Sequence, residues 1–135
     1  MNEQDVLDFI HSEFQGVLLV ESAGNFFVFY SPNDLAAEQR MPFATVMTND
    51  INDGFSDLNR PGVYRLNVGV ERATFAGLFG VGPTPDFTAL DQLLPHPVYA
   101  ASSWVCVLNP GPETFRRMRL LIAEAYALAV RRVKR

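Results

Sequence analysis

Two side chains of one predicted strand and two residues of a proline-flanked segment are the best candidates for a site. Residues 63–70 alternate between apolar and polar side chains, so Arg65 and Asn67 should point to the same face of the strand. His96 lies between two prolines, which lower the entropy cost of holding an imidazole in place, and Tyr99 follows. These four residues form our candidate ligand-binding set, in which Arg65 would suit an anionic group.

The same residues also have a purely structural interpretation. Arg65 could pair with a carboxylate such as Asp57, and His96 could cap the short helical turn before it. The binding hypothesis requires instead that Arg65, Asn67, His96 and Tyr99 open into one pocket, with Arg65 free of a saturating carboxylate. Arg65→Ala would then cost little stability, because an exposed ion pair contributes only ~0–1 kcal/mol.

Residues 49–59 are rich in Asp and Asn, but their spacing does not fit a calcium loop. When Gly54 is aligned with the glycine of an EF-hand, Ile51 falls on a ligand position and Arg60 on the position of the bidentate glutamate. Asp and Asn are common turn residues. We interpret the segment as a solvated loop and expect no metal.

Patterns for other chemistry are also missing from the sequence. No Cys or His spacing matches a zinc site. Ser102 and Ser103 lack the Gly-x-Ser-x-Gly elbow of hydrolases, and residues 80–82 lack the full glycine motif of a dinucleotide site. Cys106 lies in an apolar strand, so we expect a buried and unreactive thiol, with Trp104 beside it in the core.

These observations favour a function without catalysis. We expect no cofactor and no catalytic residue, and we favour a non-enzymatic module that binds a small molecule or a protein. A small enzyme that uses His96 and Arg65 is one alternative. Neither the sequence pattern nor the composition separates a monomer from a homodimer.

Charge is distributed unevenly along the chain, which has a net charge of −4. Residues 1–112 are acidic, whereas positive side chains gather in residues 113–135. Because a nucleic-acid-binding domain usually has a basic face and a high isoelectric point, this distribution disfavours nucleic acid as a partner. That alternative would need one exposed strip of arginines, formed by Arg116, Arg119, Arg131 and Arg132.

Length and composition indicate one folded domain that spans residues 1–135. A chain of 135 residues with 48% hydrophobic residues can bury a core without disulfide or metal. No apolar run approaches the ~20 residues of a membrane span, and the first residues are acidic, unlike a signal peptide. With a single cysteine, the chain is expected to be cytoplasmic.

Apolar periodicity and turn residues predict the elements that must position the candidate site. Helices are predicted at residues 5–14, 71–79 and 113–133, with a short helical turn at 86–94. Strands are predicted at residues 17–21, 26–30, 42–48, 63–70, 98–100 and 104–108. The expected fold class is α+β: a mainly antiparallel sheet of about five or six strands, with the N-terminal and C-terminal helices packed on one face.

Several segments resemble a family of small bacterial proteins of unknown function. The resemblance is carried by Pro42-Phe43-Ala44-Thr45, Ser56-Asp57-Leu58-Asn59-Arg60-Pro61-Gly62-Val63, Asp86-Phe87-Thr88-Ala89-Leu90-Asp91, His96-Pro97-Val98-Tyr99-Ala100 and Trp104-Val105-Cys106-Val107-Leu108-Asn109-Pro110.

More distantly, the order of elements is similar to that of MmcQ/YjbR-like proteins. The likeness includes a strand led by Trp104 and a closing helix that contains Glu124-Ala125-Tyr126. It implies an α+β domain with an antiparallel sheet, and some proteins of that type have been compared with DNA-binding folds. Neither resemblance supplies catalytic or binding residues for this chain.

Overall fold

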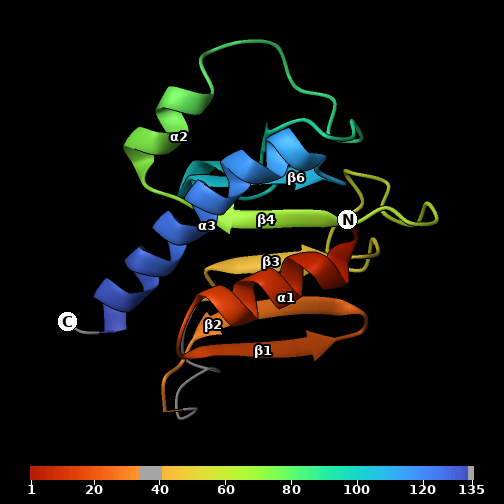
Figure 1. The fold of residues 1–135 in the computed structure, drawn as a ribbon. Coiled ribbons are helices and arrows are strands. Elements are labelled where there is room, and N and C mark those ends of the chain that lie inside the picture. The colour runs from red at the N-terminus through yellow and green to blue at the C-terminus, as the bar shows by residue number, and fades with distance from the viewer. Residues whose placement is uncertain (34–40, 134–135) are drawn as a thin grey trace.

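A single antiparallel sheet of six strands organises the part of the chain that the computed structural model describes, residues 1–33 and 41–133 (Figure 1). The strand order is β1-β2-β3-β4-β6-β5. The strands are β1 (Val17–Ser22), β2 (Asn25–Tyr30), β3 (Ala44–Met47), β4 (Arg65–Gly69), β5 (Leu94–Pro95) and β6 (Trp104–Leu108). This arrangement confirms the predicted α+β fold class.

Two helices cover one face of the sheet (Figure 1). Helix α1 (Glu3–Glu13) begins with a capping box, in which the Asn2 side chain accepts from the Asp5 N–H and the Asp5 carboxylate accepts from the Asn2 N–H. Helix α3 (Pro112–Val133) packs its apolar stripe beside it, while the shorter α2 (Arg72–Leu78) follows β4. The main core therefore lies between these helices and strands β2, β3, β4 and β6.

The opposite face of the sheet carries a second cluster of buried side chains. Its members are Met47, Leu58, Leu94, Cys106 and Leu108. Leu58 comes from the loop between β3 and β4, so this loop packs over the sheet instead of extending into solvent. As a result, strand β4 is buried on both faces, including its polar residues Arg65 and Asn67.

Most of the predicted elements are present, with ends that differ by no more than two residues. The predicted helical turn at 86–94 is wrong. The Asp86 side chain instead accepts from the backbone N–H and the hydroxyl of Thr88, which forms a turn, and Leu94–Pro95 pairs with β6 as β5.

The predicted strand at 98–100 is also wrong, for a similar reason. His96 Nδ1 accepts hydrogen bonds from the N–H groups of Val98 and Tyr99, so these donors are not available to a neighbouring strand. A short 3₁₀ helix, η2 (Ala100–Ser102), follows at once and leads into β6. The segment between β5 and β6 is therefore a compact turn built around His96.

Cys106 is buried as expected, whereas Trp104 is only partly buried. Burial raises the pKa of the Cys106 thiol to about 12, and its Sγ lies 3.7 Å from the carbonyl oxygen of Pro95. We predict that a thiol reagent labels Cys106 slowly in the native protein and rapidly in urea, because only the exposed thiolate reacts. Fast labelling of the native protein would contradict this burial.

Candidate functional site

Arg65 is buried on the face of the sheet opposite helices α1 and α3, where it is paired with Asp53. Its Nη1 donates to Asp53 Oδ1 at 3.0 Å, and its Nη2 donates to Asp53 Oδ2 at 2.7 Å. The Arg65 side chain is 1% exposed and that of Asp53 is 10% exposed. The binding hypothesis required Arg65 to be free of a saturating carboxylate, and this condition is not met. The structural interpretation, in which Arg65 pairs with a carboxylate, is confirmed, with Asp53 instead of Asp57 as the partner.

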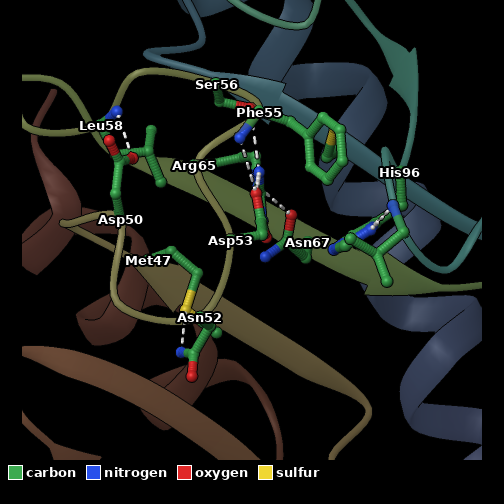
Figure 2. A network of polar contacts seen from close by, with 12 residues as sticks. Met47, Asp50, Asn52, Asp53, Phe55, Ser56, Leu58, Arg65, Asn67 and His96 are labelled. Carbon is green, nitrogen blue, oxygen red and sulfur yellow. Dashed lines mark hydrogen bonds and ion pairs between the residues drawn. The ribbon is translucent and has the colours of Figure 1, made fainter.

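The remaining hydrogen bonds of Arg65 extend this pair into a network (Figure 2). Nε donates to Asn67 Oδ1 at 2.9 Å, and Nη1 also donates to Ser56 Oγ at 2.9 Å. Asn67 Nδ2 in turn donates to Thr45 Oγ1 on β3. Asn67 thus fixes the orientation of the guanidinium from the neighbouring position on the strand face.

The carboxylate of Asp53 stays ionised despite its partial burial. Burial alone would raise the pKa, but the hydrogen bonds and charge of Arg65, together with the Phe55 N–H, hold the pKa of Asp53 below its ordinary value. The two opposite charges cancel within the site.

Turns inside the loop between β3 and β4 bring Asp53 to this position. Asp50 Oδ1 accepts from the Leu58 N–H, and Asn59 Oδ1 accepts from the Asp50 N–H. The polar side chains of this loop therefore act as turn residues. In the described parts of the chain, no three His, Cys, Asp or Glu residues are grouped in a way that could hold a metal ion.

His96 reaches the same region from the turn after β5. Because its Nδ1 accepts two backbone N–H groups, each at 3.0 Å, the proton of the neutral ring lies on Nε2. Burial, with a smaller effect of the Arg65 charge, lowers the pKa of His96 to about 4, although the Asp53 charge opposes this shift. His96 is thus a neutral hydrogen-bond donor at neutral pH.

A cavity of about 360 Å³ lies between these elements. Arg65, His96 and Tyr99 line it. Asn67 accepts a hydrogen bond from Arg65 but does not line the cavity. Sequence reasoning did not assign the other principal lining residues to a site: Phe27, Met47, Asp53, Val98 and Trp104. Figure 2 shows the imidazole of His96 directed from its turn toward the Asn67 side of the network.

A family model described as a family of unknown function, DUF6194, matches residues 1–135. The chain belongs to the DUF6194 family. No curated protein and no solved structure matches it. The likeness of this DUF6194 chain to MmcQ/YjbR-like proteins therefore stays a prediction.

Arginines of helix α3 in this DUF6194 chain mostly contact other side chains. Arg116 pairs with Glu113 at 2.9 Å and Arg131 pairs with Glu71 at 3.0 Å. Arg119 lies over the ring of Phe9 at 5.1 Å.

Among the described residues, no helix has the length and apolarity that a membrane span needs.

Asp53→Ala is expected to lower the free energy of unfolding by about 3–5 kcal/mol, because it leaves the Arg65 charge buried without a partner. Arg65→Ala should also be strongly destabilising, in contrast to the sequence-based expectation. Urea unfolding measures both effects. The control is Asp57→Asn in the same loop. The Asp57 side chain is 61% exposed, and asparagine tolerates its φ of 52°, so this change should alter stability by about 0.5 kcal/mol or less. Equal effects of the two aspartate substitutions would contradict a structural role for the pair.

Acid should destabilise the protein through His96. The folded-state pKa of about 4 lies below the unfolded value of 6.5, so the unfolded chain binds more protons between these pH values. The contribution of His96, roughly 3 kcal/mol, is complete above pH 6.5 and is lost as the pH falls toward 4.

The matched variant for this pH dependence is His96→Asn. Its side-chain oxygen can accept the same two backbone N–H groups but does not titrate. Unfolding curves from pH 7 to pH 4 should therefore show a flatter pH dependence for the variant. Identical slopes would show that His96 is not the group responsible.

Proposed function

We propose that this protein is a non-enzymatic module that binds a small, neutral and largely apolar molecule in the cavity beside Arg65. The observation that carries the proposal is the neutrality of the cavity floor: its two charged groups, Arg65 and Asp53, are already paired with each other. A ligand with a net charge would lose its hydration without meeting a free counter-charge. A neutral ligand pays no such cost.

The walls of the cavity favour a flat ligand. Three aromatic side chains line it, namely Phe27, Tyr99 and Trp104, together with the aliphatic Met47 and Val98. Apolar walls with a few fixed polar groups are typical of small-molecule sites, and aromatic rings pack well against planar ligands. The volume of about 360 Å³ suits a ligand of one or two rings.

The hydrogen bonds of the polar residues support binding over catalysis. A general base needs a free lone pair and a pKa near the working pH. His96 uses the lone pair of Nδ1 for two backbone N–H groups and has a pKa of about 4. The guanidinium of Arg65 is likewise held by Asp53, which also disfavours our earlier assignment of an anionic ligand.

The single tryptophan of the chain provides a direct test. Trp104 lines the cavity, and its indole N–H gives the one such signal in an NMR spectrum of the ¹⁵N-labelled protein. We expect acetophenone, a neutral aromatic ketone, to shift this signal in a saturable way. Benzoate and benzamidinium have the same ring but opposite charges, and both should bind more weakly.

Two variants test whether acetophenone binds in this cavity. Tyr99→Ala removes a wall residue and should weaken acetophenone binding, whereas Leu120→Ala, an exposed position on α3, should leave it unchanged. Stronger binding of either charged analogue would contradict the neutral-ligand proposal, as would an indole signal that none of the three probes moves.

A further inference from the structure

His96 offers the cavity a hydrogen-bond donor that no other described residue uses. Within the described residues, the side-chain hydrogen bonds of His96 involve only Nδ1, so the proton on Nε2 has no protein acceptor. His96 is almost fully buried and lines the cavity. Because the two backbone N–H groups on Nδ1 fix the tautomer, Nε2 presents a donor to whatever occupies the cavity.

The cavity also contains an acceptor with spare capacity. Asp53 Oδ1 accepts from Arg65 Nη1 and from the Phe55 N–H, whereas Oδ2 accepts only from Arg65 Nη2 among the described residues. A carboxylate oxygen can accept at least two hydrogen bonds. Asp53 Oδ2 can therefore receive one donor from a ligand without loss of the ion pair.

The donor and the acceptor come from separate segments and do not satisfy each other. Asp53 belongs to the loop between β3 and β4, and His96 belongs to the turn after β5. Both line the same cavity, yet no hydrogen bond joins them. A ligand between them would need to accept a hydrogen bond at one point and donate one at another.

We propose that the ligand is a planar aromatic carboxamide or lactam, whose carbonyl oxygen accepts from His96 Nε2 and whose N–H donates to Asp53 Oδ2. The inference rests on the proposed function and specifies its ligand class. An amide group places a donor and an acceptor side by side without net charge, in agreement with the neutral floor of Arg65 and Asp53. The aromatic ring would pack against Trp104 and Tyr99.

A comparison of benzamide with acetophenone tests the ligand class in the unmodified protein. The two probes share the ring and the carbonyl group, but acetophenone has a methyl group in place of the amide NH₂. Because a hydrogen bond to a charged group is worth more than one between neutral groups, benzamide should bind about tenfold more tightly. The indole N–H of Trp104 again reports the titration.

The outcomes separate this inference from the proposed function. Equal affinities, or tighter binding of acetophenone, would overturn the amide class but leave a neutral-ligand site in place. If neither probe binds, both the ligand class and the proposed function fail. A tenfold preference for benzamide supports both.

His96→Asn then tests the donor. Asparagine can keep the two backbone hydrogen bonds, but its shorter side chain does not reach the position of Nε2. The affinity for benzamide should fall about fivefold, which corresponds to one neutral hydrogen bond, and acetophenone should lose a similar factor. Leu120→Ala is the control and should change neither affinity.

Unchanged benzamide binding in His96→Asn would overturn the role of His96. Thermal unfolding of the variant shows whether it is folded under the conditions of the titration. If it is not, the Nε2–H signal of His96 in the ¹⁵N-labelled unmodified protein decides the question: it should shift in a saturable way as benzamide is added, and no shift would overturn the role of His96.

Discussion

Burial of the Arg65 guanidinium is the constraint on which the second face of the sheet depends. Removing this charge from water is costly unless every donor finds an acceptor with good geometry. Asp53, Ser56 and Asn67 provide these acceptors, two of them from one loop. The loop between β3 and β4 must therefore fold onto the sheet, and the burial of Leu58 adds an apolar contact that holds it there.

A polar face on an antiparallel sheet usually meets water, but in this protein it is covered. The helix side of β4 contributes Leu66 and Val68 to the main core, while the other side contributes Arg65 and Asn67. Among buried side-chain polar atoms of the described residues, the Tyr64 hydroxyl alone has no partner, and it is not part of the network. Four of the five N–H groups of Arg65 thus have acceptors, and the network can serve as a rigid floor for the cavity.

Long periodic segments of the sequence were sufficient to predict α1, α3, the first hairpin and β4. The failures lie at 86–94 and 98–100, where Asp86 and His96 accept backbone N–H groups, since apolar spacing contains no information on such bonds. The carboxylate partner of Arg65 also could not be predicted from the sequence pattern. The loop offers several carboxylates, and the choice of Asp53 depends on how its turns close, so the cavity could not be predicted from strand alternation alone.

Close packing at one glycine determines the wall of the cavity beside this network. Gly69 on β4 pairs with Trp104 on β6, and a Cβ atom at Gly69 would lie 2.9 Å from Cε2 of the indole. A side chain at this position would have to displace the ring, because real Cβ atoms do not approach so closely. Trp104 lines the cavity at Arg65 and also a second one of about 600 Å³. The absence of a side chain at Gly69 therefore lets the indole lie across β4, where it forms a wall common to both cavities. The shape of the candidate site thus depends on a strand position that has no side chain, as well as on the polar residues Arg65 and Asn67 of the same strand.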